Sequence, residues 1–331
     1  MAVTTRKRAT LKEVAQAAGV SIASVSNVLN ERGYVGEKAR NRILDAIEHL
    51  GYRQNRAAKS LKTGEFPLIG VVLPNVSNLF YTSLVESLMD ECRKYKMAIC
   101  LLSTKDKAEG ELECVDYLLS HDVMGIIWCA PLTDEVEIEA KIRDFPTVFI
   151  GRELEKYDCI VADDYQGGYE LGKLGLSRGH SKIGVVTGPL ERDIVKKRQA
   201  GLEAAIKGRA EIIWQYQSDF SNITPENIIA TIMRCEATLV VMPNDFSAIN
   251  LMKILTERGV RIPQDVSFVG YDNSDLCEYI QPSLTSVGQP RQSIAEEAIQ
   301  CLIERTKTPD KPSRTIVKPI QVEVRDSVKY C

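Results

Sequence analysis

The stretch that most constrains this chain is residues 10–30, TLKEVAQAAGVSIASVSNVLN, which has the pattern of two short helices joined by a turn. Thr10 stands three residues before Glu13, the spacing at which a hydroxyl and a carboxylate each satisfy a backbone N–H group at a helix start. Apolar residues then recur at helical spacing on one face, and polar residues fall on the other. The pattern predicts a first helix that begins at Leu11.

Gly19 predicts the turn, because a residue without a Cβ atom adopts left-handed backbone angles at little cost. Ser21 is a suitable N-cap for a second helix, which we expect to run to about Leu29. Its outward side chains are mostly small, so the helix can enter the major groove of B-DNA, where each base pair shows a different donor and acceptor pattern. The DNA-facing residues expected here are Thr10, Ser21, Ile22, Ala23, Ser24, Asn27 and Asn30.

An ordinary amphipathic helical hairpin would show the same small residues and the same turn. The distribution of charge favours the DNA-binding alternative. Up to Lys62 the chain holds 12 Lys and Arg against 5 Asp and Glu, whereas the other 269 residues hold 30 against 40. The net charge of −3 therefore combines a basic head with an acidic body, which is expected when only the head meets phosphate groups.

A third helix is predicted from Glu37 to Leu50, with Gly51 just past its end. It would complete a three-helix domain. The cationic residues near its start, Lys38, Arg40 and Arg42, either contact phosphates or form a solvated face, and the sequence leaves both alternatives open.

The motif VAQAAGVSIASVSNVLN and the later segment GYRQNRAAKSL are together similar to the DNA-binding domain of the lactose/galactose-repressor family of bacterial regulators. The resemblance implies a hinge helix that orders on specific DNA and enters the minor groove, with Leu61 as the wedge between base steps and Ala58 at the close approach to the partner's hinge. A plain linker is the alternative. The DNA-contacting residues that the resemblance implies in this segment are Asn55, Ala58, Lys59, Leu61 and Lys62.

From Leu68 onward, apolar runs alternate with helical patterns at residues 81–95 and 109–120. Strand, helix and strand with short connections predict a parallel sheet covered by helices. The pattern restarts with KIGVVTG at Lys182, continues through a helix at residues 197–206 and reaches DVSFVGYDN, which indicates two similar lobes. We therefore expect an all-α helix-turn-helix head and an α/β two-lobed body with parallel sheets.

The resemblance implies that this body is periplasmic-binding-protein-like, with the chain crossing three times between the lobes. The domains expected are a helix-turn-helix domain at 1–53, a hinge helix and linker at 54–66, and a two-lobed effector-binding and dimerisation domain at 67–331, with lobe one at about 67–162 and 290–319 and lobe two at about 163–289 and 320–331.

Ligands of such sheets bind beyond the carboxyl ends of the strands, here the cleft between the lobes. Phe80 and Tyr81 can each stack on a ligand ring or belong to the core. The resemblance implies that Arg198 clamps the effector, although a surface arginine on a basic helix is the alternative, and that Asp272 accepts hydrogen bonds from neighbouring hydroxyls. The effector-binding residues expected are Asn75, Asn78, Phe80, Tyr81, Arg198, Phe220, Asn244, Asp272 and Gln289.

Gly151 stands where many relatives have an effector-binding aspartate, and Arg152 follows it. Trp128 and Cys129 replace the usual small or polar residues at the end of the preceding strand. We expect a sugar or glycoside as the effector first and a nucleobase second. A protein that responds to no small molecule is the third alternative.

Other classes of protein are less consistent with the sequence. The nine cysteines form no C-x-x-C pair and there are three histidines, so we expect no structural zinc and no other metal or cofactor. An enzyme is not expected, because GGYELG at Gly167 is no phosphate loop and neither G-x-G-x-x-G nor G-x-S-x-G occurs. A transport-type small-molecule-binding protein would carry a signal peptide and no basic head.

No segment has the apolar length of a membrane span and the start lacks a secretory signal, so we expect no membrane partner and a location in the bacterial cytoplasm, at the nucleoid. The expected partner is a double-stranded DNA operator. A single helix-turn-helix contacts few bases, which predicts a homodimer on a pseudo-palindrome. The resemblance implies a dimer rather than a tetramer, because the sequence up to Cys331 shows no leucine heptads.

Overall fold

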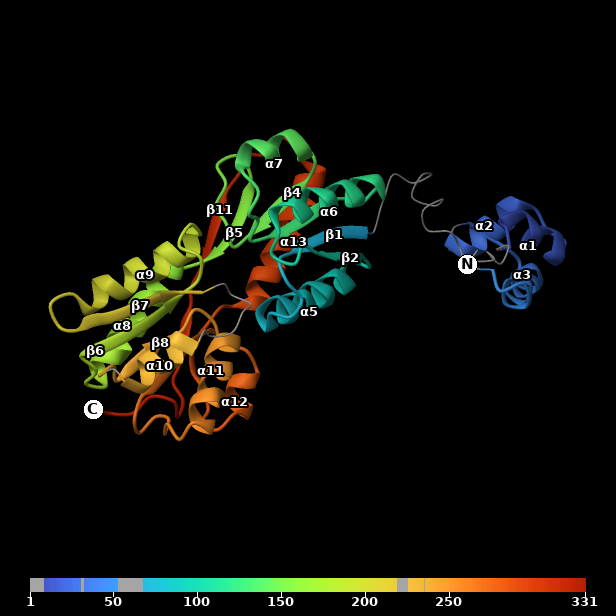
Figure 1. Ribbon diagram of the computed structural model, residues 1–331. Helices are drawn as coiled ribbons and strands as arrows, with labels where there is room; N and C mark the ends of the chain where they lie inside the picture. Colours follow the sequence, from blue (N-terminus) through green and yellow to red (C-terminus); the bar gives the residue numbers. More distant parts are fainter. Residues whose placement is uncertain (1–8, 31–32, 53–67, 219–225, 235) are drawn as a thin grey trace. The chain divides into compact units, whose positions relative to one another are not determined.

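The computed structural model describes residues 9–30, 33–52, 68–218, 226–234 and 236–331 of the chain. The chain divides into two compact units, Met1–Phe66 and Pro67–Cys331 (Figure 1). The predicted hinge segment, residues 54–66, lies outside the described residues.

The first unit contains three helices, α1 Leu11–Ala18, α2 Ile22–Asn30 and α3 Glu37–His49, whose apolar faces share one small core. Val14, Val25 and Ile43 from the three helices are fully buried in it. This arrangement confirms the predicted helical head. The third helix ends one residue earlier than predicted, because Leu50 is its C-cap and its side chain is exposed.

The predicted start of α1 and the turn after it are also confirmed. The backbone N–H of Thr10 donates to Glu13 Oε2 at 2.7 Å, and the backbone N–H of Glu13 donates to Thr10 Oγ1 at 3.3 Å. Gly19 has a φ of +63° and ends the helix in the left-handed conformation, which glycine adopts without steric cost. Ser21 Oγ then accepts a hydrogen bond from the backbone N–H of Ser24 at 3.1 Å.

The second unit consists of two lobes, each built on a six-stranded sheet. The sheet of lobe one has the order β11-β5-β4-β3-β1-β2, and every pair of neighbours is parallel. Helices α5 and α13 pack on one face, and α6 and α7 pack on the other. Its elements are β1 Leu68–Leu73, α5 Leu79–Lys94, β2 Ala98–Ser103, α6 Ala108–Ser120, β3 Ile126–Cys129, α7 Glu135–Ile142, β4 Thr147–Ile150, β5 Asp158–Ala162, α13 Arg291–Lys307 and β11 Thr315–Lys318.

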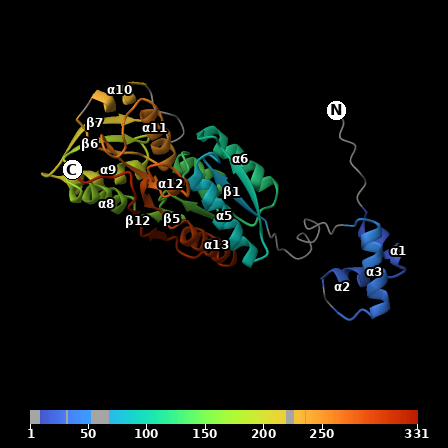
Figure 2. The same ribbon diagram turned by 90° about the horizontal axis from the view of Figure 1, so that it is seen from below.

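The sheet of lobe two has the order β12-β10-β9-β8-β6-β7, and it is parallel except for the antiparallel pair of β10 and β12. Helices α8 and α9 lie side by side on one face, and α10 and α11 cover the other (Figure 2). Its elements are α8 Asp164–Ser177, β6 Lys182–Thr187, α9 Asp193–Ile206, β7 Glu211–Gln217, α10 Glu226–Arg234, β8 Leu239–Val241, α11 Asp245–Glu257, β9 Ser267–Asp272, α12 Leu276–Tyr279, β10 Thr285–Gly288 and β12 Gln321–Glu323.

These sheets confirm the predicted fold class, a helical head and a two-lobed α/β body with parallel sheets. The chain leaves lobe one after β5, returns to it with α13 and β11, and ends in lobe two with β12. The carboxyl ends of the parallel strands meet the loops that line the cleft between the lobes. Two predicted helices begin earlier than expected: α5 at Leu79 and α9 at Asp193.

The described residues contain no helix that is long and apolar enough to cross a membrane. The same residues contain no group of three His, Cys, Asp or Glu side chains with the proximity that a metal ion requires.

Candidate functional site

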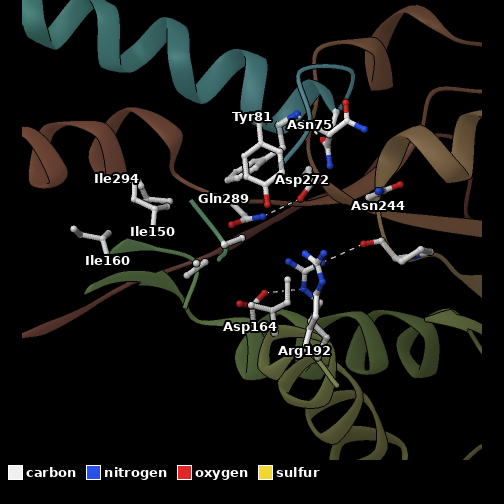
Figure 3. Close-up of a pocket in the computed structure, with 18 of the residues that line it drawn as sticks. Asn75, Tyr81, Ile150, Ile160, Asp164, Arg192, Asn244, Asp272, Gln289 and Ile294 are labelled. Atoms are coloured by element: carbon white, nitrogen blue, oxygen red, sulfur yellow. Dashed lines mark hydrogen bonds and ion pairs between the residues drawn. The ribbon is translucent and has the colours of Figure 1, made fainter. Parts of the chain in front are cut away.

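A pocket lies between the two lobes, at the carboxyl ends of the strands (Figure 3). It encloses about 740 Å³ of empty space, part of which is open to solvent. The structure brings together in this one pocket all the expected effector-binding residues that it describes, whereas Phe220 lies outside the described residues. These pocket residues are Asn75, Asn78, Phe80, Tyr81, Arg198, Asn244, Asp272 and Gln289.

Arg198 is held at the floor of the pocket by three groups. Its Nε donates to Asp164 Oδ1 at 2.7 Å, and its Nη1 donates to the carbonyl oxygen of Pro243 at 3.1 Å. Its guanidinium carbon lies 3.4 Å from the ring centroid of Tyr271, whose hydroxyl donates to Asp164 Oδ1 at 3.0 Å. Because only 15% of the Arg198 side chain is exposed, it is not the surface arginine that the sequence left as an alternative.

The glycines of α8 explain how α9 comes close enough to place Arg198. A Cβ atom on Gly168 would lie 1.9 Å from the carbonyl oxygen of Arg198. On the facing helix, a Cβ atom on Gly201 would lie 1.9 Å from the carbonyl oxygen of Tyr165. The GGYELG segment is therefore a close-packing helix surface, which explains its glycines without any phosphate loop.

Asp272, the last residue of β9, has a strained backbone, with a φ of +104°. Strain of this kind in a non-glycine residue is typical of functional sites. The side chain faces the pocket, and Gln289 Nε2 donates to its Oδ1 at 2.8 Å. Burial raises the pKa of the Asp272 carboxyl to about 8, although the Arg198 charge and the Gln289 hydrogen bond lower it. Burial therefore opposes ionisation of this carboxyl.

This raised pKa predicts a pH-dependent stability. Asp272 keeps its proton in the folded chain up to about pH 8 and loses it near the ordinary value of 3.8 when unfolded, so folding takes up a proton. We expect the free energy of unfolding to fall as the pH rises from about 4 to about 8, by at most about 1.4 kcal/mol per pH unit for one proton. Urea unfolding, followed by the fluorescence of Trp128 and Trp214, measures it.

The Asp272→Asn variant is the control, because it carries no titrating carboxyl at this position. Its stability should fall less steeply over the same pH range. Some slope will remain, because burial also raises the pKa of Asp245. Equal slopes for the variant and the unmodified protein would contradict the raised pKa of Asp272.

The two aromatic residues at the start of α5 occupy different environments. Phe80 is 7% exposed and belongs to the core of lobe one, where its ring meets that of Tyr81 edge to face at 5.2 Å. Tyr81 points into the pocket (Figure 3). Burial raises the pKa of its hydroxyl, which therefore stays neutral and can donate a hydrogen bond.

The three asparagines of the pocket also stabilise the loops that carry them. Asn78 Oδ1 accepts from the backbone N–H of Phe80 at 3.0 Å and caps α5, and Asn244 Oδ1 accepts from that of Ser247 at 2.8 Å and caps α11. Asn75 Nδ2 donates to Asp106 Oδ2 at 3.3 Å. These contacts fix the orientation of the amides at the edge of the pocket.

Several lining residues were not among those expected from the sequence. Asp106 and Asp164 follow strands β2 and β5, so their position after an apolar run was a usable signal. Arg192, the N-cap of α9, lies 3.7 Å from Asp106 across the cleft. The larger aliphatic side chains carry no such signal, because a pocket residue and a core residue look alike in sequence. Those lining the pocket are Ile150, Ile160, Ile194 and Ile294.

In the helical head, most of the expected DNA-facing residues lie in α2 or directly before it. Ser21, Ile22 and Ala23 are exposed, and Ser24 and Asn27 are half-buried. Thr10, the N-cap of α1, is also exposed. The expected residues that lie outside the described positions, or whose side chains do, are Asn30, Asn55, Ala58, Lys59, Leu61 and Lys62.

A helix-turn-helix head together with a two-lobed body of this kind defines a class of ligand-linked DNA-binding regulators. Residues 10–55 match the bacterial regulatory proteins of the lacI family, and residues 174–328 match the periplasmic binding protein-like domain. The chain is 32% identical to the HTH-type transcriptional repressor PurR of Vibrio atlanticus (strain LGP32), over 97% of this chain and 99% of that protein. The chain belongs to the lacI family, which consists of transcriptional regulators.

Solved structures share the fold. The crystal structure of the Lac repressor dimer bound to operator and the anti-inducer ONPF superposes with a TM-score of 0.85, at 23% identity, over 98% of this chain and all of that chain. A LacI family transcriptional regulator from Enterococcus faecium with bound ribose superposes with a TM-score of 0.72, at 28% identity, over 80% of this chain and 99% of that chain.

Proposed function

We propose that the protein is a repressor that binds a pseudo-palindromic operator as a homodimer and that a sugar or glycoside in the interlobe pocket controls it. The observation that carries the effector proposal is the convergence of amide, carboxyl and guanidinium groups from separate strand ends on one pocket. Groups of this kind can hydrogen-bond to several hydroxyls of one small ligand.

The charges of the pocket favour an uncharged ligand. Asp164 is paired with Arg198, and Asp106 lies 3.7 Å from Arg192. Burial raises the pKa of the Asp272 carboxyl and so opposes its ionisation. Few uncompensated charges therefore face the pocket, which suits a neutral molecule rich in hydroxyls. The related Enterococcus faecium regulator, which holds ribose, agrees with this class of ligand.

A nucleobase is the second candidate. The side chains of Ile150, Ile160 and Ile294 gather at one end of the pocket, and the ring of Tyr81 lies near Gln289 and Asp272 (Figure 3). A flat heterocycle would fit between apolar walls and use the polar groups at its edge.

Control would act through the arrangement of the lobes. In this structure Arg192 of lobe two faces Asp106 of lobe one, and Lys197 of lobe two pairs with Glu153 of lobe one. A ligand can change the affinity for DNA only through its differential affinity for two such arrangements. An effector that bonds to Arg192 or Asp106 in the pocket would shift the balance between two arrangements of the lobes.

Selection from a randomised DNA pool tests the whole proposal. The full chain is mixed with the pool, alone and with each of a panel of mono- and disaccharides and nucleobases, and the bound DNA is sequenced. A palindrome whose enrichment changes with one sugar is the expected result. A palindrome that responds only to a nucleobase would replace the effector class, and the absence of any palindrome would overturn the DNA-binding proposal.

Asn27, on the outward side of α2, is expected to read one base. An asparagine amide can bond to adenine with two hydrogen bonds in the major groove, a contact worth about 1–3 kcal/mol of discrimination. Asn27→Ala should therefore relax the base preference at one position of each half-site. The matched control is Asn41→Ala, which changes an exposed residue of α3. The same preferences in both selected sets would contradict the role of Asn27.

A further inference from the structure

A cavity lies inside lobe two, where helices α8 and α9 meet the sheet. It encloses about 440 Å³ of empty space, part of which is open to solvent. Val195, Arg198 and Leu202 of α9 line it, and their spacings of three and four residues place them on one side of the helix. Val185 of β6 and Val241 of β8 line it from the sheet. The cavity therefore lies between α9 and the strands that this helix covers.

This cavity is distinct from the interlobe pocket. Among the described residues, only Arg198 and Pro243 line both spaces, and Arg198 Nη1 donates to the carbonyl oxygen of Pro243 at 3.1 Å. Every residue that lines the cavity comes from lobe two, whereas residues of both lobes line the pocket. A molecule in the cavity would therefore contact one lobe, and a molecule in the pocket would contact two.

The walls of the cavity offer few polar groups. Leucine, valine, methionine and proline side chains line it, and each polar side chain in the lining already bonds to another group of the protein. These pairs are Thr187 with the carbonyl oxygen of Tyr216, Gln199 with Glu203, and both Arg198 and Tyr271 with Asp164.

Such a lining favours an uncharged apolar occupant. A water molecule in a protein interior needs two to four polar partners, and a charged group would lose its hydration without gaining a partner. An apolar molecule instead gains dispersion contacts with the surrounding side chains. An apolar cavity of about 150 Å³ is enough for benzene, so a molecule of one ring has a suitable size for this space.

The cavity lies under the half of α9 that carries contacts toward lobe one. Val195 is 4% exposed, yet among the described residues it does not belong to the packed core of lobe two that includes Leu202. Lys197 pairs with Glu153 of lobe one, and Arg198 lines the pocket. A molecule that fills the cavity would therefore support this half of α9 and the two groups that it carries.

We propose that this cavity is a second ligand site, which accepts an uncharged apolar molecule of about one ring and holds the first half of α9 in place. The site lies outside the effector pocket, so the inference does not depend on the effector proposed above. A molecule bound there is linked to the arrangement of the lobes through Lys197 and Arg198.

Calorimetric titration of the full chain tests the site, with toluene as the probe. We expect toluene to bind with a dissociation constant of about 1 mM or lower. Benzylamine and benzoate, which carry a charge on a ring of the same size, should bind at least about tenfold more weakly. The absence of toluene binding, or equal binding of the charged compounds, would overturn the inference.

Filling the cavity shows where toluene binds. Val195→Phe places a ring in the cavity and changes no residue of the pocket, so the affinity for toluene should fall at least about tenfold. The matched control is Val136→Phe, at a position of α7 that is 74% exposed, which should leave the affinity unchanged. Unchanged affinity in folded Val195→Phe would place toluene elsewhere and contradict the proposal.

A second variant covers the case in which Val195→Phe does not fold. Val241→Ile adds one methylene group to the cavity wall from β8 and keeps a branched side chain that suits a strand. It should weaken toluene binding at least about threefold, because little volume is then left for a ring. A folded Val241→Ile protein that binds toluene as the unmodified protein does would also count against the site.

Hydrogen exchange measures the action on α9. With saturating toluene, the backbone amides of residues 196–202 should exchange at least about threefold more slowly, because the occupant supports the helix. The amides of α13 in lobe one serve as the reference and should not change. Exchange in α9 that is the same with and without toluene would overturn the proposed support of this helix.

Discussion

The Arg198→Met variant is expected to lose about 3 kcal/mol of unfolding free energy, because it leaves a buried carboxylate without its partner. The side chain of Asp164 is 5% exposed, and the guanidinium of Arg198 is its ion-pair partner. Methionine retains an apolar stem over the ring of Tyr271, so the cost is mainly electrostatic. Urea unfolding followed by tryptophan fluorescence measures the loss.

The double variant Arg198→Met with Asp164→Asn separates charge from packing. An asparagine is neutral, and its amide oxygen can still accept from the hydroxyl of Tyr271, which now donates to Asp164 at 3.0 Å. We expect the double variant to recover most of the lost stability while both variants lose their response to the effector. A double variant no more stable than Arg198→Met would show that lost packing on Tyr271 is the cause.

Gly201→Ala is expected to destabilise the body by about 2 kcal/mol net, because overpacking an interior costs up to about 3 kcal/mol. The new Cβ atom would lie 1.9 Å from the carbonyl oxygen of Tyr165 and 2.8 Å from the backbone nitrogen of Tyr169, so α9 must move away from α8. The gain in helix propensity from Gly to Ala, about 1 kcal/mol, opposes this cost and is smaller than it. The shift also displaces Arg198, which lies one turn earlier on α9.

The control for this variant is Ala200→Leu, which enlarges the neighbouring residue on the exposed side of the same helix. Its unfolding free energy should match that of the unmodified protein within about 0.5 kcal/mol, as surface substitutions usually do. A Gly201→Ala protein of unchanged stability would show that the contact between α8 and α9 has room for a methyl group.

The head was largely predictable because its signals are local. The capping box of Thr10 and Glu13 and the left-handed turn at Gly19 each depend on residues within one helical turn, and the structure has both. Leu50 shows the limit of such signals, because its apolar character continued the helical pattern although the chain turns there.

The body shows what local patterns miss. Strands such as β5 and β7 were not predicted: β5 is short and follows β4 with no helix between them, and β7 is an edge strand whose polar residues break the apolar run. The polar residues of the site, such as Asp272, could be found by their place at the end of a strand. Asp106 and Arg192 belong to the site only because the two lobes face each other, and no local pattern contains that information.

The return of the chain to lobe one has a consequence for the order in which the protein folds during synthesis. The sheet of lobe one is complete only when β11 pairs with β5. Next to this pair, the backbone N–H of Arg314 donates to Asp158 Oδ1 across 156 residues of chain. The sheet of lobe two is likewise incomplete until β12, which ends at Glu323, has been synthesised and pairs with β10. The helical head has its own core and can fold as it leaves the ribosome. A ribosome that stalls before β11 would therefore hold a folded DNA-reading head on a body in which neither sheet is complete.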